Sequence, residues 1–214
     1  MVLLDVTPLS LGLATKGDLM SVVIPRNTPI PVKMDDVFLT TEDNQSTASF
    51  PVYEGERTKA SENNLLDKFS LSGLPRIPRG HAINVMFELD YDGILKVSAE
   101  DETTGSKKGI TITNEKGRLS SAEIKRMIEE AAFFKEEDKK FKKMVEAKNA
   151  LDEYIYRMEK AMKNFDVSSK VSASEKETIM AAFRKGKRLL RSEEHMRLQC
   201  LRTILRSYKI FVNQ

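Results

Sequence analysis

The 214-residue sequence predicts an α+β fold in two parts, an antiparallel β-sandwich followed by packed helices. Nine of the ten glycines and all seven prolines precede residue 119. The charge divides at the same place, since residues 1–118 carry 13 basic and 17 acidic side chains and residues 119–214 carry 22 and 15. Glycine and proline punctuate strands and turns, and their scarcity permits long helices. The border is therefore expected near residues 117–120.

The first part is organised around residues 38–57. Phe38 precedes a turn-forming polar stretch at 43–46, and Ala48, Phe50 and Val52 then alternate with more polar residues. This pattern predicts two strands joined by a loop, with one apolar face. The stretch contains no nucleophile with a base, no metal shell and no phosphate cradle. It offers an apolar floor beside backbone groups and amide side chains, which favours binding over catalysis.

Short strands are predicted on both sides of this stretch. Apolar runs lie at 9–13 and 20–24, prolines between 25 and 31 mark a loop, and further runs follow at 69–71, 83–89, 95–99 and 110–113. Asp92-Gly93 separates two alternating runs, which predicts a hairpin whose two turn residues both have positive φ. Seven or eight short strands without intervening helices indicate an antiparallel β-sandwich.

The second part is predicted to be helical. Ser120 and Glu123 form a capping-box pattern before apolar residues at helical spacing, and a second helix is expected over residues 138–164. Ser172 and Ser174 mark the start of a third helix, and apolar residues from 198 to 212 indicate a fourth. We expect these helices to pack on one another and on the sandwich.

Composition excludes several classes of protein. The single cysteine, Cys200, cannot form an internal disulfide and is expected to be a small buried apolar residue. No signal peptide is visible, and no apolar run approaches the roughly 20 residues of a membrane span. We therefore expect a soluble protein without membrane partners, in the cytoplasm or alternatively the nucleus. His81 and His195 are too isolated to predict a metal site.

Nine segments resemble, in unbroken order over about residues 2–163, the substrate-binding domain of the seventy-kilodalton heat-shock chaperones. The sequence of residues 116–120 resembles that of the cytosolic eukaryotic branch. The nine segments are Asp5–Gly12, Ile24–Thr28, Asp43–Gln45, Val52–Arg57, Asn63–Leu66, Pro78–Gly80, Asp92–Leu95, Val97–Ala99 and Ile110–Asn114.

The resemblance implies a molecular chaperone domain that holds extended apolar segments of unfolded polypeptides in a channel. It also implies the fold class, a β-sandwich followed by an α-helical lid or bundle. In relatives, peptide release is coupled to ATP and Mg in an N-terminal nucleotide-binding domain. The 214 residues contain no phosphate-binding glycine loop. We therefore expect no cofactor in this chain and no enzymatic activity.

The resemblance also implies particular site residues. The predicted peptide-binding residues are Leu13, Thr15, Lys16, Phe38, Leu39, Thr41, Gln45, Ala48, Phe50 and Ile83. The predicted lid latch consists of Asp43, Arg79, Asp152 and Tyr156, for which ordinary solvated surface is the alternative. Val2, Leu3, Leu4 and Asp5 match the end of the interdomain linker. The expected domains are thus the linker at 1–5, the sandwich at 6–118 and the helices at 119–214.

Several expected partners follow from the same resemblance. They are unfolded polypeptides, the nucleotide-binding domain of a full-length relative and J-domain co-chaperones. The chain has no tryptophan and ends without the acidic motif that binds repeat-type co-chaperones, and beyond residue 164 the resemblance is expected to fade. Self-association through the C-terminal helices is a further expectation.

Departures from the family pattern support an alternative function. Lys16 and Thr41 stand where relatives usually close an arch with small, apolar or aromatic side chains, so the channel is expected to be weaker or shifted toward acidic peptides. Residues 176–214 hold ten basic and three acidic side chains, densest at 184–188. This run is either a nuclear-import or nucleic-acid patch or a solvated helix face. The alternative is an interaction scaffold with a weakened pocket, whose basic helices bind an acidic partner or nucleic acid.

Overall fold

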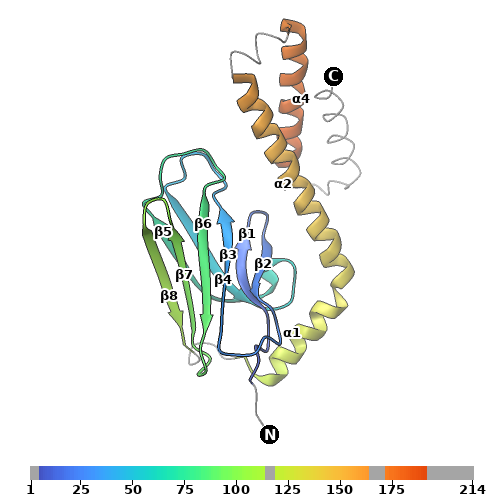
Figure 1. The fold of residues 1–214 in the computed structure, drawn as a ribbon. Coiled ribbons are helices and arrows are strands. Elements are labelled where there is room, and N and C mark those ends of the chain that lie inside the picture. Colours follow the sequence, from blue (N-terminus) through green and yellow to red (C-terminus); the bar gives the residue numbers. More distant parts are fainter. Residues whose placement is uncertain (1–4, 114–118, 164–171, 192–214) are drawn as a thin grey trace. The chain divides into compact units, whose positions relative to one another are not determined.

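A computed structural model describes residues 5–113, 119–163 and 172–191 (Figure 1). The predicted fourth helix, Cys200, His195 and the linker positions Val2, Leu3 and Leu4 lie outside the described residues. The elements, in chain order, are β1 (Leu11–Thr15), β2 (Leu19–Ile24), β3 (Val32–Leu39), β4 (Thr47–Glu54), the short 3-10 helix η1 (Ala60–Glu62), β5 (Asn64–Ser72), β6 (Ala82–Leu89), β7 (Leu95–Asp101), β8 (Ser106–Ile112), α1 (Ser121–Phe133), α2 (Lys135–Lys163) and α4 (Ala173–Arg191).

The strands form two four-stranded sheets in which every neighbouring pair is antiparallel. One sheet has the order β2-β1-β4-β5 and the other has the order β3-β6-β7-β8. The two strands predicted within residues 38–57, β3 and β4, therefore belong to different sheets. The loop between them crosses from one sheet to the other instead of closing a hairpin.

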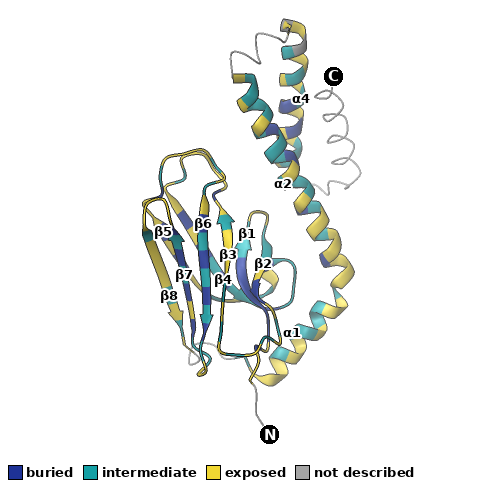
Figure 2. Cartoon of the chain, in the orientation of Figure 1, coloured by how far each residue is buried: buried dark blue, intermediate teal, exposed yellow. Residues whose placement is uncertain are grey.

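Both sheets contribute side chains to one apolar core. Buried positions alternate with exposed or half-buried ones along β6 and β7, as the period of a strand requires (Figure 2). The rings of Phe50 and Phe69 stack with centroids 5.2 Å apart. Each fully buried large apolar side chain stabilises the fold by about 1.5–3 kcal/mol. The most deeply buried large members are Leu13, Ile24, Val52, Leu71, Ile83, Val85, Phe87 and Val97.

The predicted hairpin of β6 and β7 is confirmed, but its turn differs from the expected one. Gly93 has a φ of 72°, but Asp92 does not have positive φ. The Asp90 carboxylate accepts hydrogen bonds from the amides of Asp92 at 3.0 Å and Ile94 at 2.9 Å. Because this side chain organises a five-residue loop, only one position of the turn needs the left-handed region.

The capping box at the start of α1 is confirmed. Ser120 Oγ accepts a hydrogen bond from the Glu123 amide at 3.2 Å, and the Ser120 amide donates to Glu123 Oε2 at 2.7 Å. The bonds from the Ser120 amide and hydroxyl hold the pKa of Glu123 below its ordinary value. The local sequence pattern therefore sets where this helix begins.

The described chain divides into two compact units, residues 1–139 and residues 140–214. Helix α1 and the first turn of α2 thus belong to the unit that contains the sheets. This finding corrects the expected fold class. A β-sandwich that ends near residue 118 and is followed by a helical lid is wrong, and the described fold is α+β, with two antiparallel sheets and three helices.

The second unit has its own small core between α2 and α4. Leu151, Ile155 and Phe183 are buried there. The half-buried residues around them are Ala147, Met158, Met162, Ile179, Leu189 and Leu190. Lys187 Nζ and a Glu159 carboxylate oxygen form an ion pair at 2.7 Å across the same two helices. None of the helices in the described ranges is long and apolar enough to cross a membrane.

Candidate functional site

Two loops beside the ends of β3 and β6 brace each other and carry several of the predicted site residues. We refer to residues 40–46 and 73–81 as the loop pair. Four main-chain hydrogen bonds of 2.8–3.2 Å join the two loops, and they run from Gly80 to Thr40, Thr40 to His81, Asn44 to Ile77 and Leu74 to Ser46. The backbones of the two loops are therefore held against each other.

Gln45 shapes the first loop from inside. Its Oε1 accepts hydrogen bonds from the amides of Thr41 at 3.0 Å and Glu42 at 3.3 Å, and its Nε2 donates to the carbonyl of Thr47 at 3.0 Å. An amide NH2 has two N–H donors, so one of them remains for another acceptor. The predicted role of Gln45 in hydrogen-bonding a peptide stays a prediction, and its observed role is to hold the loop.

Two of the four predicted latch residues meet on the loop pair. Asp43 Oδ1 accepts a hydrogen bond from the backbone amide of Arg79 at 2.9 Å. Asp152 and Tyr156 lie one turn apart on α2, within the second unit. Two of the predicted latch residues therefore lie in each unit, and the complete latch stays a prediction.

The predicted apolar pocket residues are part of the common core. Leu13, Ala48, Phe50 and Ile83 are each at most 6 % exposed. Phe38 packs against this cluster and is the register partner of Ile83. Phe38, Ala48 and Ile83 all lie within two residues of the loop pair in the sequence. The core thus reaches the loop pair, and the role of these residues in binding stays a prediction.

The remaining predicted contact residues are more exposed. Leu39 at the end of β3 is 60 % exposed, and Thr41 and Lys16 are exposed as well. Lys16 lies in the turn between β1 and β2, where the Asp18 amide donates to the carbonyl of Thr15 at 3.0 Å. The Thr15 hydroxyl donates to the carbonyl of Leu19 at 3.1 Å. The arch predicted from Lys16 and Thr41 stays a prediction.

A buried histidine–aspartate pair supports the second loop, and sequence reasoning missed it. His81 Nε2 lies 2.8 Å from Asp101 Oδ1, and the Asp101 side chain is fully buried. Asp101 also accepts hydrogen bonds from the Thr103 amide at 3.0 Å and the Thr104 hydroxyl at 2.7 Å. Burial raises the pKa of Asp101, but the hydrogen bonds from Thr104, His81 and Thr103 outweigh burial and lower this pKa below its ordinary value.

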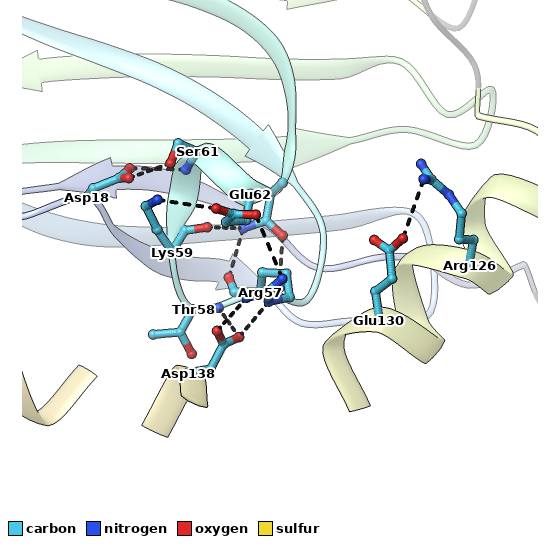
Figure 3. A network of polar contacts seen from close by, with 10 residues as sticks. Asp18, Arg57, Thr58, Lys59, Ser61, Glu62, Arg126, Glu130 and Asp138 are labelled. Atoms are coloured by element: carbon cyan, nitrogen blue, oxygen red, sulfur yellow. Dashed lines mark hydrogen bonds and ion pairs between the residues drawn. The ribbon is translucent and has the colours of Figure 1, made fainter. Parts of the chain in front are cut away.

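A second long-range contact ties the start of α2 to the sheets (Figure 3). Arg57 donates two hydrogen bonds of 3.0 Å to the two carboxylate oxygens of Asp138, and the Thr58 amide donates to Asp138 at 2.9 Å. The Arg57 guanidinium also lies 4.4 Å from the centroid of the Phe134 ring. The bonds to Asp138 raise the pKa of Arg57. No local pattern in the sequence indicated this pair.

A pocket of about 670 Å³ lies at the other end of β6 from the loop pair. It is lined by residues 5–9, 89, 91–93 and 119–121, among others, and includes Glu54. Burial raises the pKa of Glu54, although a hydrogen bond from Asn64 lowers it in part. Asp5, the one described residue of the predicted linker, lines this pocket. Among the described residues, no cluster of three or more His, Cys, Asp or Glu could hold a metal ion.

The fold and the loop pair define an α+β protein of two antiparallel sheets, with exposed loop residues beside an apolar core. The chain belongs to the Hsp70 family, because the sequence model described as Hsp70 protein matches residues 1–209. Two relatives illustrate the similarity. A heat shock 70 kDa protein of Neurospora crassa is 50% identical over 178 residues, which are 83% of this chain and 28% of that protein. Heat shock cognate 70 kDa protein 3 of Dictyostelium discoideum is 48% identical over 180 residues, which are 84% of this chain and 29% of that protein.

The family match corrects the narrower resemblance. The match continues to residue 209, well past residue 164, where the resemblance was expected to fade. The matching model is described as Hsp70 protein and does not specify one part of the family's proteins. The assignment to the substrate-binding domain, drawn from residues 2–163, is therefore wrong in its extent. Membership in the Hsp70 chaperone family replaces it.

Two further expectations depended on that narrower assignment. The absence of a cofactor and the absence of enzymatic activity both assumed that this chain was separate from the nucleotide-binding part of the family. The family model matches residues 1–209 and does not distinguish this chain from the nucleotide-binding part of the family. The expectation of no cofactor is therefore corrected, and the exclusion of enzymatic activity is no longer supported. The chain spans less than a third of the length of the two relatives.

Proposed function

We propose that this chain holds an extended, apolar segment of an unfolded polypeptide at the loop pair. The observation that carries the proposal is the position of Leu39 and Thr41. Leu39 is the last residue of β3, an edge strand of its sheet, and Thr41 lies two residues further along in the loop. Both are exposed, beside the half-buried Phe38 and its buried register partner Ile83. An edge with exposed backbone and an adjacent apolar core fits the binding of extended peptides through main-chain hydrogen bonds.

The predicted site residues divide into two groups in this proposal. The core group, Leu13, Phe38, Ala48, Phe50 and Ile83, forms the apolar floor. The loop group, Thr15, Lys16, Leu39, Thr41 and Gln45, supplies backbone and polar contacts. The latch predicted from Asp43, Arg79, Asp152 and Tyr156 belongs to the same proposal.

The expected affinity is modest. Burying one leucine-sized side chain of the peptide contributes about 1.5–3 kcal/mol. Main-chain hydrogen bonds add a net of about 0.5–1.5 kcal/mol each, because they replace bonds to water. Fixing a flexible peptide opposes both contributions. Micromolar dissociation constants and ready release are therefore expected, as a chaperone requires.

The test is fluorescence-anisotropy titration of a labelled, uncharged, leucine-rich heptapeptide against the whole chain. Ala48→Trp introduces a large side chain at a buried position of the floor, whereas Val37→Trp introduces the same side chain at a position 55 % exposed on β3. We expect micromolar binding by the unmodified chain and by Val37→Trp, and at least tenfold weaker binding by Ala48→Trp.

Leu39→Asp is a second variant in case Ala48→Trp does not fold. It places a charge on the exposed end of β3 without disturbing the core, and it should also weaken binding. Circular dichroism and a thermal melt establish that each variant is folded. Absence of binding by the folded, unmodified chain, or equal binding by all folded variants, would exclude peptide binding at the loop pair.

A further inference from the structure

One face of α4 carries an unusual concentration of positive charge. From residue 184 to the end of the helix at 191, five of the eight residues are basic and none is acidic. All five basic residues are exposed, and they are Arg184, Lys185, Lys187, Arg188 and Arg191. Both acidic residues of α4 lie in its N-terminal portion, at 175 and 177. We refer to these five side chains as the basic face.

The opposite face of the same helix is already occupied. Phe183 is 3 % exposed and packs with Leu151 and Ile155 of α2, with Ile179, Leu189 and Leu190 around it. Gly186 is buried on this side as well. An amphipathic helix that enters a bilayer needs its apolar face for the lipid. The apolar core residues of α4 pack against α2, so its exposed side is dominated by charge, with Met180 as an exposed apolar side chain at 44%.

The positive charge is mostly uncompensated within the described part of the chain. Lys187 forms an ion pair with Glu159, whereas Arg184, Lys185, Arg188 and Arg191 have no acidic partner among the described residues. A helix face that is merely solvated typically mixes both signs of charge. A face of one sign attracts a polyanion and raises its rate of association.

The spacing of the arginines suits a row of phosphates. Positions 184, 188 and 191 follow the i, i+4 and i+7 spacing of one helix face. They span about 10 Å of helix, given a rise of 1.5 Å per residue. Each guanidinium presents a planar set of donors that matches a phosphate in a bidentate manner. The apolar side of the helix packs against α2, so the three groups are presented together on its other side.

We propose that the basic face of α4 binds the phosphate backbone of duplex nucleic acid without sequence preference. The only aromatic residue of α4, Phe183, is buried, so the helix lacks the stacking platform typical of single-strand binders. This binding is separate from the peptide site, because it uses residues of the second unit alone. It gives this chain an anionic partner in addition to the proposed polypeptide.

The experiment is an anisotropy titration of the whole chain against a fluorescein-labelled 20-base-pair DNA duplex at 50 and 200 mM salt. Four phosphate contacts predict a loss of affinity of roughly a hundredfold between these concentrations. The variant Arg184→Glu/Arg188→Glu/Arg191→Glu should bind at least tenfold more weakly. The matched control Lys140→Glu/Lys142→Glu/Lys143→Glu changes the net charge equally at exposed positions of α2 and should lose less than threefold.

A milder variant covers the case in which charge reversal disturbs α4. Arg184→Gln/Arg188→Gln/Arg191→Gln retains good helix formers, and it should reduce the slope of log affinity against log salt by about 2.7 for three lost duplex contacts. Circular dichroism confirms the helix content. The proposal is overturned if both triple-glutamate variants lose affinity equally, or if the glutamine variant is folded and keeps the full slope. It is also overturned if the chain prefers a single strand, or binds vesicles containing phosphatidylserine but no duplex.

Discussion

Arg57 and Asp138 are 81 residues apart in the sequence and join through two hydrogen bonds of 3.0 Å. Their side chains are only 14% and 9% exposed. Because Asp138 also accepts from the Thr58 amide, its carboxylate connects the first turn of α2 to both the side chain and the backbone of the β4–β5 connection. This contact explains why the start of α2 belongs to the same compact unit as the sheets.

The first prediction concerns this contact. Asp138→Asn should lower the free energy of unfolding by ~3 kcal/mol, because the mostly buried Arg57 guanidinium loses its charged hydrogen-bond partner and keeps only the longer ion pair to Glu62 at 3.9 Å. The measurement is urea denaturation followed by circular dichroism, with limited proteolysis at residues 133–139 as a second readout. Glu136→Gln is the control, since Glu136 lies on the same turn with its side chain 76% exposed and should change stability by less than about 0.5 kcal/mol. Equal effects of the two substitutions would contradict the role assigned to Asp138.

The second prediction concerns acid sensitivity at Asp101. The pKa of this carboxyl is lower in the folded chain than its ordinary value of 3.8. The contribution of the ionised group to stability is therefore present above pH 3.8 and is lost as the pH falls through the lower folded value. Unfolding measured by urea at pH 6 and at pH 3 should show a smaller pH dependence for Asp101→Asn than for the unmodified chain.

Asp67→Asn is the control for this measurement, because Asp67 is exposed and lies on the edge strand β5. Its pH dependence should match that of the unmodified chain. An unchanged pH dependence in Asp101→Asn would show that other carboxyl groups account for the acid sensitivity.

These two contacts show why part of the structure could not be predicted from the sequence. The alternation of β6 and the capping box at Ser120 are local patterns, and both are found as predicted. His81 and Asp101 lie 20 residues apart with no shared pattern, and only the antiparallel arrangement of the strands brings them together. His81 therefore looked isolated, although it is part of a buried network.

The assignment of the strands to the two sheets could not be predicted from the sequence either. Phe38 and Ala48 flank one polar loop, and local periodicity alone does not determine whether their strands pair with each other. In the structure, β3 pairs with β6, and β4 lies between β1 and β5. The hairpin predicted at Asp92-Gly93 is present, but its turn has a different geometry, because the side chain of Asp90 accepts hydrogen bonds from the loop amides in addition to the backbone bonds.

The third prediction concerns the start of α1. Ser120→Ala removes the hydroxyl that accepts from the Glu123 amide, and it should cost about 1 kcal/mol of stability. Ser121→Ala, one residue into the helix, is the matched control and should have little effect or slightly stabilise the helix. Thermal melts of the two variants check the difference. Equal melting temperatures would show that the cap does not limit the stability of this unit.

The last prediction concerns the charge preference of the proposed peptide site. Lys16 is exposed in the β1–β2 turn, and it stands where an uncharged residue was expected from the family pattern. An exposed charge pair contributes about 0.2–1 kcal/mol, which corresponds to a factor of up to about five in affinity. We expect the unmodified chain to bind a leucine-rich heptapeptide with one glutamate up to fivefold more tightly than the same peptide with one lysine. Lys16→Glu should reverse this preference, whereas Lys68→Glu, at an exposed position of β5, should leave it unchanged. If Lys16→Glu does not change the charge preference, the source of selectivity lies elsewhere on the loops. Raising the salt concentration should reduce the charge preference in either case.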